Sequence, residues 1–262
     1  MKRTVPFKPG LLTLGLGLSA LLPFALLIVW SFSGRWYFPS LLPTEWSGRA
    51  LSDVLSSGSQ LWSALWGSVW VATLSALLGT LLALPAARAL ALSPLRRRGL
   101  WTALLLAPLV LPSFASVMGV QVVFIRLGLA DTRAGVVLAH LIPVTPYAVV
   151  LLSGVFGGYD PRTEEVARTL GAGRWATWWR VTLPILLPGV LVSLAFAFLV
   201  SWSEYLLTLI VGGGQVLTLP LLLFSAAQGG DYALTAALAL VFVAPTVLLF
   251  AFLSPGLVSR RP

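Results

Sequence analysis

Long apolar stretches separated by short polar segments dominate the chain. Six of them approach the ~20 residues that a helix needs to cross the hydrocarbon core of a bilayer. Their apolar positions are continuous rather than alternating, which favours helices over the strands of a barrel. We therefore expect an all-α membrane protein with six transmembrane helices. The expected spans are Leu11–Phe32, Leu61–Leu84, Leu100–Ile125, Ala134–Phe156, Ile185–Val211 and Ala233–Leu253.

The composition supports a lipid environment. Of the 262 residues, 58 % are hydrophobic and only 10 % are charged, so a soluble domain could not cover its surface with polar groups. The net charge of +9 raises the question of nucleic acid. The basic residues, however, lie in short segments between the apolar stretches, which is typical of a membrane protein and makes a nucleic-acid partner unexpected. The chain has no cysteine, and we expect neither catalytic residues nor a metal site.

The basic residues also predict the orientation, because they are unevenly divided between alternate connections. This places both termini in the cytoplasm, and we interpret the first stretch as a retained span rather than a cleaved signal peptide. We expect one transmembrane domain, 1–262, with its core at about 60–256 and a cytoplasmic loop at 158–184. The cytoplasmic set is Lys2, Arg3, Lys8, Arg88, Arg96, Arg97, Arg98, Arg162, Arg168, Arg174, Arg180, Arg260 and Arg261, and the outer set is Arg35, Arg49, Arg126 and Arg133.

Small residues and prolines inside the spans predict how the helices pack. The second span carries small side chains at four-residue spacing, which indicates a closely packed face. Prolines are tolerated in membrane helices when neighbouring groups bond the freed carbonyls, so for each of them we favour tolerance over a kink. After the fifth span, the stretch around Leu219–Phe224 is too short to cross and predicts a short helix or a re-entrant segment at the outer surface. The small face is Ser68, Ala72, Ala76 and Thr80, and the prolines are Pro108, Pro112, Pro143, Pro146 and Pro245.

The loop between the fourth and fifth spans has the pattern of two short helices. Asp160 is a good N-cap, and Glu164 and Glu165 follow in the first turn, where the helix dipole favours acidic groups. Gly171 lies where a left-handed residue would end that helix. The second segment is amphipathic, with Trp175, Trp178 and Trp179 among arginines. The alternative is a helix lying on lipid headgroups through these tryptophans.

This loop resembles that of the membrane subunits of binding-protein-dependent (type I) ABC importers. Their pattern is Glu-Ala-Ala, three residues, Gly, nine residues, Ile, one residue, Leu-Pro. The chain departs from it at Val166, in the second position, which is usually alanine, and at Val181, where isoleucine is usual. The residues in register are Glu165, Ala167, Gly171, Leu183 and Pro184.

The resemblance implies a permease subunit in the bacterial inner membrane, with a coupling helix that docks on a cytoplasmic ABC ATPase dimer. ATP and Mg would be bound by the ATPase and not by this chain, which would not itself be an enzyme. A second permease subunit and an extracytoplasmic solute-binding protein complete such a transporter. Among these permeases the chain is most similar to the spermidine/putrescine group, which suggests a polyamine. Sugars, thiamine and ferric iron remain alternatives.

Glu204 is the acidic residue inside the fifth expected span, next to Trp202 and Tyr205. A charge at that depth costs roughly 2.5–3.5 kcal/mol on insertion scales and therefore faces a cavity or another helix. One interpretation is a polar contact on the translocation path, and the other is a hydrogen bond between helices. For His140, the single histidine, we favour a hydrogen bond between helices over a proton relay.

Two other functional classes are alternatives to the importer. A gradient-driven secondary transporter or channel would need no ATPase, but it predicts inverted repeats and several charges within the spans. An intramembrane protease would need a serine–histidine or paired-aspartate arrangement. Neither explains the loop between the fourth and fifth spans.

Overall fold

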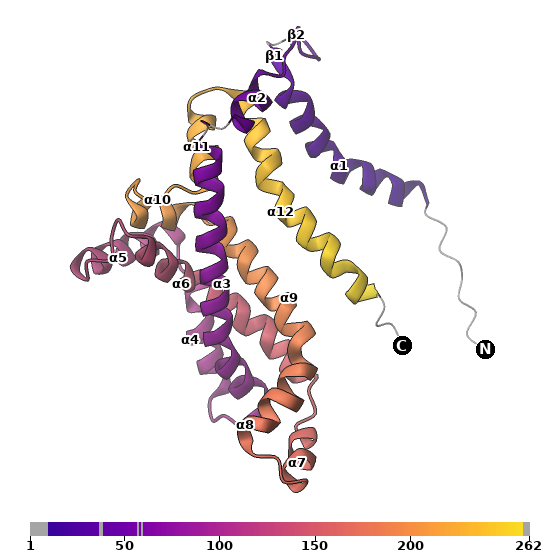
Figure 1. Ribbon diagram of the computed structural model, residues 1–262, viewed down its shortest axis with the longest axis vertical. Helices are drawn as coiled ribbons and strands as arrows, with labels where there is room; N and C mark the ends of the chain where they lie inside the picture. Colours follow the sequence, from indigo (N-terminus) through magenta and orange to yellow (C-terminus); the bar gives the residue numbers. More distant parts are fainter. Residues whose placement is uncertain (1–9, 37–38, 57, 59, 259–262) are drawn as a thin grey trace. The chain divides into compact units, whose positions relative to one another are not determined.

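Helices make up most of the computed structural model, which describes residues 10–36, 39–56, 58 and 60–258 (Figure 1). Five helices are long and apolar enough to cross a membrane, and a bent pair can supply a sixth span. This confirms the expected all-α membrane architecture. The terminal basic residues used for orientation lie outside the described residues. The long helices are α1 (Leu11–Ser31), α3 (Leu61–Leu92), α6 (Arg133–Gly157), α9 (Leu183–Trp202) and α12 (Tyr232–Val258), and the bent pair is α4 (Arg98–Val110) with α5 (Ser113–Arg126).

The chain divides into two compact units, and the first combines Met1–Trp62 with Leu222–Val247. It holds α1, the short antiparallel strands β1 (Ser33–Arg35) and β2 (Glu45–Trp46), helix α2 (Arg49–Leu55) and the first part of α12. Arg49 pairs with Asp231 at 2.8 Å, and Trp30 packs edge-on against Tyr232 at 5.3 Å between ring centres. These contacts fasten α2 and the end of α1 to the start of α12.

The second unit comprises Ser63–Leu221 and Leu248–Pro262. Figure 1 shows α7 (Arg162–Thr169) and α8 (Arg174–Thr177) at one end of its helices, while α5 and α10 (Leu206–Gly212) lie next to each other away from that end. One apolar core lies near α7 and α8, and another lies beside α10. The first core contains Ala83, Ala87, Leu90, Ala148, Val149, Leu152, Phe156, Tyr159 and Leu186, and the second contains Val71, Val117, Val136, Val137, Ala139, Leu207, Val211 and Val216.

Helix α3 packs through the predicted small-residue face, and all four of its members are buried. Small residues allow the backbones of neighbouring helices to approach closely. A Cβ at Gly79 would lie 2.5 Å from Val144 of α6, and one at Gly189 of α9 would lie 2.5 Å from Val155. Helix α6 is therefore in close contact with both neighbours. The prediction from the four-residue spacing is confirmed.

The third expected span is not one helix, because α4 and α5 meet at an angle of 95°. Leu111 and Pro112 between them are both extended, with ψ of 143° and 120°. A proline disfavours the helical region for the preceding residue, which breaks the chain direction at this point. Our expectation of tolerance is wrong at Pro112. It is correct at Pro143 and Pro146, which lie inside the continuous helix α6.

The fifth expected span also has different bounds. The helix ends at Trp202, and α10 begins at Leu206 after a short break. On its other side it continues back through a π-helical turn, Trp178–Thr182, to Arg174. A proline leaves the carbonyl four residues earlier without a donor, so a widened turn just before Pro184 relieves the clash with its ring. The short helix expected near Leu219 is confirmed as α11 (Leu219–Gln228).

Candidate functional site

Helix α7 begins at Arg162, one residue later than expected, so that Pro161 rather than Asp160 is its N-cap, but Asp160 still bonds the first turn. The Oδ1 atom of Asp160 accepts a hydrogen bond from the N–H of Arg162 at 3.0 Å, which satisfies one of the free donors of the first turn. Glu164 and Glu165 follow in that turn. Their charges lie at the positive end of the helix dipole. The local sequence is therefore sufficient to begin a helix here.

The end of α7 is a Schellman motif around Gly171. This glycine has a φ of +89°, a conformation that residues with a Cβ rarely adopt. The N–H of Gly171 donates to the carbonyl of Arg168 at 3.0 Å, and the N–H of Ala172 donates to the carbonyl of Ala167 at 3.0 Å. This pair of bonds defines the motif. The expected left-handed helix end is thus confirmed, and α7 is a short helix closed at both ends.

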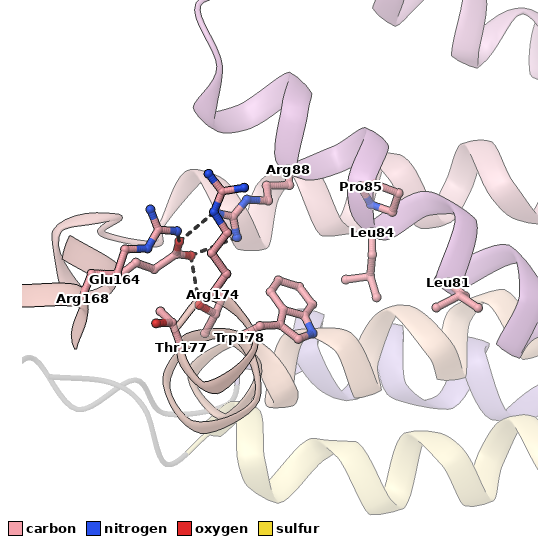
Figure 2. Close-up of a pocket in the computed structure, with 10 residues that line it drawn as sticks. Leu81, Leu84, Pro85, Arg88, Glu164, Arg168, Arg174, Thr177 and Trp178 are labelled. Atoms are coloured by element: carbon pink, nitrogen blue, oxygen red, sulfur yellow. Dashed lines mark hydrogen bonds and ion pairs between the residues drawn. The ribbon is translucent and has the colours of Figure 1, made fainter. Parts of the chain in front are cut away.

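Glu164 attaches α7 to the rest of the second unit. Its two carboxylate oxygens accept hydrogen bonds from the two terminal nitrogens of Arg88, at 2.9 and 2.8 Å (Figure 2). This is the bidentate geometry that makes arginine–carboxylate pairs strong. The Glu164 side chain is only 7 % exposed. Arg88 belongs to α3, so the pair joins residues that are far apart in the sequence.

Neutral hydroxyl groups complete the surroundings of Glu164. Thr182, in the π-helical turn, donates to its Oε1 atom at 2.9 Å, and Tyr159 donates to the same atom at 3.2 Å. The hydrogen bonds from Arg88 lower the pKa of Glu164 below its ordinary value, burial opposes this, and the bond from Thr182 adds to the lowering. The carboxylate is therefore held ionised. One side chain links α7 with α3 and with the helix that continues into α9.

Glu165, the next residue along the chain, has the opposite environment. It is exposed, and within the described part of the chain no residue forms an ion pair or hydrogen bond with its carboxylate. Val166 and Leu170 beside it are 59 % and 83 % exposed. Ala167 is half-buried beneath this surface. We call Glu165, Val166 and Leu170 the outer face of α7.

The structure separates the predicted motif into two parts. Glu165, Ala167 and Gly171 belong to α7 and its C-terminal cap, whereas Leu183 and Pro184 open α9. The motif therefore brackets the turn that carries Thr182. The sequence pattern does not identify Glu164 and Arg88 as partners. Arg88 did carry a signal, because it lies in the last turns of an otherwise apolar helix, where an isolated charge needs a partner.

The tryptophans after Gly171 have two different environments. Trp175 and Trp179 are 74 % and 50 % exposed and pack edge-to-face, with ring centres 5.6 Å apart. Trp178 is half-buried and lies under the Arg88 guanidinium, 5.9 Å from its carbon. The exposed pair has the character of interfacial anchors. Trp178 instead contributes a cation–π contact to the Arg88–Glu164 pair.

At the other end of this unit, Glu204 occupies the break between α9 and α10. Its Oε1 accepts from the N–H of Leu207 at 3.3 Å, so the carboxylate caps α10. It also lines a cavity of about 360 Å³ together with Pro143, Tyr147 and Phe196. Trp202 does not line this cavity; it is 2 % exposed and stacks on Phe198. Tyr205 is half-buried. A role of these residues in translocation stays a prediction.

His140 joins three helices by neutral hydrogen bonds. Its Nδ1 lies 2.7 Å from the Ser201 hydroxyl, and its Nε2 lies 2.9 Å from the Thr208 hydroxyl. Thr208 donates its own proton to the carbonyl of Glu204 at 3.1 Å. Nε2 must therefore carry the imidazole proton, and Ser201 donates to Nδ1. The expected inter-helix role of His140 is confirmed.

The comparisons with known proteins agree with this architecture. Residues 75–260 match the family described as the binding-protein-dependent transport system inner membrane component. The chain is 38 % identical over 185 residues to the molybdenum transport system permease protein ModB of Mycobacterium tuberculosis, covering 64 % of this chain and 70 % of that protein. It is 29 % identical over 230 residues to the putative 2-aminoethylphosphonate transport system permease protein PhnV of Salmonella typhi, covering 87 % and 86 %.

The fold is similar to that of a solved bacterial ABC transporter chain. That transporter is involved in the import of the acidic polysaccharide alginate, and the TM-score is 0.73 at 18 % identity over 93 % of both chains. The family match covers the helices α6 to α10 and the closed helix α7 between them. The chain is therefore a multi-pass inner-membrane protein that belongs to the binding-protein-dependent transport family, as a permease subunit of the type I ABC importers.

Proposed function

We propose that this permease forms half of the translocation pathway of an ATP-driven importer and that α7 couples it to a cytoplasmic ATPase. The observation that carries the proposal is the division of roles between two adjacent carboxylates. Glu164 anchors α7 from behind to α3 and to the start of α9, while Glu165 stays free on the outer face. A short helix closed at both ends and anchored in this way can transmit a displacement from a bound ATPase to α3 and α9 without unfolding.

The partners follow from the same proposal. An ABC ATPase dimer carrying ATP and Mg would bind the outer face of α7, since this chain would supply no ATPase site. A second permease subunit, identical or similar, would supply the other half of the pathway. The family's dependence on a binding protein favours an extracytoplasmic solute-binding protein as the third component. Membership of this family argues against the gradient-driven transporter considered from the sequence.

The substrate we propose is a small anionic solute. The polyamine suggested by sequence resemblance finds no support among the relatives, whose names refer to molybdenum and 2-aminoethylphosphonate. Molybdenum in neutral water is an oxyanion, and 2-aminoethylphosphonate carries an anionic phosphonate beside its ammonium group. The Glu204 carboxylate is not a free site for a polyamine cation either, because it accepts a hydrogen bond from the N–H of Leu207 and caps α10. In cells that lack the chain, we expect the molybdenum content to fall while putrescine uptake is unchanged. A loss of putrescine uptake with an unchanged molybdenum content would instead favour a polyamine as the substrate.

The ATPase contact can be tested by cross-linking, because the chain contains no cysteine. Val166→Cys places a single thiol on the outer face of α7, where the native side chain is 59 % exposed. Leu55→Cys is the matched control, since Leu55 of α2 is 60 % exposed. With a short thiol-to-amine cross-linker and the co-expressed ATPase, we expect a permease–ATPase adduct from Val166→Cys alone. Equal adducts from both variants, or none, would contradict the docking role of α7.

A further inference from the structure

A cavity of about 600 Å³ lies against the inner side of the α7 attachment and has two chemically different ends. Figure 2 shows Leu81, Leu84 and Pro85 along α3 on one side, while the side chains of Arg88, Arg168 and Arg174 gather at the other. Trp178 lies between them. All these residues belong to the second unit. The cavity is amphipathic, with an apolar wall and a cationic end.

The cationic end has more positive charge than its own carboxylate can balance. Glu164 is the single acidic residue among the lining side chains. It is bound twice by Arg88, and Arg168 reaches it only at 3.5 Å. Arg174 has no ion-pair or hydrogen-bond partner for its side chain among the residues that the structure describes. Three guanidinium groups around one carboxylate leave a surplus charge of about two, which an anion would neutralise.

The surroundings of the cavity indicate where such an anion would come from. The cavity lies beside the last turns of α3 and the first turns of the helix that continues into α9, which are ends of two membrane spans. The exposed pair Trp175 and Trp179 marks the same level, and tryptophans concentrate at the membrane–water interface. A free anion would satisfy the arginines and leave the apolar wall bare. A phospholipid offers both a phosphate and an acyl chain.

We propose that this cavity binds an anionic phospholipid of the cytoplasmic leaflet. Its phosphate is held by Arg174 and Arg168, and an acyl chain lies along Leu81 and Leu84. Arginine suits this role because its planar guanidinium can bind phosphate oxygens in pairs. Basic cavities between membrane helices are a recurrent form of headgroup recognition. The site does not depend on the ATPase-coupling role and would exist in the isolated permease.

Native mass spectrometry of the delipidated, full-length chain in detergent tests the proposal. The probes are phosphatidylglycerol, phosphatidylcholine with the same acyl chains, and inorganic phosphate as the soluble anion. The variants are Arg174→Gln and the matched control Arg180→Gln, an exposed arginine of the same helix that does not line the cavity. We expect phosphatidylglycerol to bind the wild type more tightly than phosphatidylcholine. Arg174→Gln should weaken it about fivefold, as expected for one basic residue at a membrane surface, and Arg180→Gln should not.

Each other outcome overturns the assignment in its own way. Equal losses in the two arginine variants would mean a diffuse attraction of lipid to the basic surface. Displacement of the lipid by inorganic phosphate at matched ionic strength would identify a site for a soluble anion instead. If the two lipids bind alike and Arg174→Gln instead lowers ATPase co-purification, the surplus charge belongs to a protein contact. A Leu84→Gln variant that binds phosphatidylglycerol normally would remove the acyl-chain part.

Discussion

The two ends of the second unit fasten their helices by different chemistry. Near α7, an ion pair between Arg88 and Glu164 joins α3 to α7 and to the turn before α9. Near α10, a neutral imidazole between two hydroxyls joins α6, α9 and α10 through His140. The Arg88 side chain is 35 % exposed, whereas His140 is 1 % exposed. The Arg88–Glu164 ion pair lies where a span ends and solvent can reach it, whereas His140 is buried where desolvating an ion would cost more.

The strongest test of this contrast is the pair of adjacent carboxylates in α7. Glu164→Ala removes the partner of Arg88 and the acceptor for Thr182, and breaking a mostly buried pair costs about 3 kcal/mol. Glu165→Ala removes an exposed side chain and should change stability by less than about 0.5 kcal/mol. Thermal unfolding of the purified protein, with protease cleavage near α7 as a local probe, measures both. Similar losses in the two variants would show that α7 is not held by Glu164.

A second test concerns the α6–α9 contact that lies between the two ends. Gly189→Val places a methyl group into Val155, and overpacking of this kind costs about 1–3 kcal/mol. Gly154→Val on α6 is the matched control, because a Cβ there meets no heavy atom within 4 Å. The double variant Gly189→Val/Val155→Ala should recover part of the loss, as expected for residues in direct contact. Additive losses in the double variant would mean that the helices do not touch at this point.

Substitution of His140 should lower the stability less than substitution of Glu164. His140→Phe keeps an aromatic ring, somewhat larger than imidazole, but removes two hydrogen bonds, at a cost of about 1–2 kcal/mol. Thr208 keeps its bond to the carbonyl of Glu204, so its hydroxyl is not stranded as a charge would be. The same thermal unfolding assay measures this variant. A loss larger than that of Glu164→Ala would reverse the contrast between the two ends.

The smallest expected effect is the response of the α7 attachment to acid. The pKa of Glu164 is lowered in the folded protein, so the ionised group contributes stability above its ordinary value of 4.5. That contribution is lost as the pH falls through the lower folded value. The groups around the carboxylate are Arg88, Arg168, Thr182 and Tyr159. Hydrogen exchange of the α7 amides, corrected for intrinsic rates, should be constant between about pH 7 and 5 and faster below about pH 4.

The comparison variant for the pH experiment is Glu164→Gln, which keeps the shape of the side chain and cannot ionise. Its α7 amides should exchange faster than those of the wild type at neutral pH and show little further change in acid. A wild-type profile without a step, beside an unchanged profile for Glu164→Gln, would assign the attachment to the surrounding apolar core rather than to the ion pair.

The sequence was sufficient where structure depends on local spacing. It predicted the helical character of the spans, the buried face of α3 and both ends of α7, because each of these follows from residues within one or two turns. The sequence was not sufficient to predict which prolines interrupt a helix. Pro112 and Pro143 both lie within apolar stretches, yet one breaks the chain and the other does not. Many residues of α6 are buried by neighbouring helices, while none of the described residues of α4 is buried, and that difference exists only in the folded protein.

The site shows the same division. The spacing around Gly171 predicted where the short helix of the loop ends, but it could not predict which of two consecutive glutamates faces inward. That choice depends on where α3 places Arg88, a residue 76 positions away in the chain. Likewise, the capping role of Glu204 depends on a helix break that apolar periodicity does not reveal.

The continuous helix from Arg174 to Trp202 has a mechanical consequence. It has 29 residues, and near one end the Thr182 hydroxyl donates a hydrogen bond to Glu164 of α7. At a rise of ~1.5 Å per residue, Thr182 lies about 12 Å from Arg174 and about 30 Å from Trp202 along the helix. If the helix moved as a rigid body about Thr182, a displacement of about 1 Å at Arg174 would become one of about 2.5 Å at Trp202. The position of Thr182 along the helix would thus set how far one end moves for a given movement of the other.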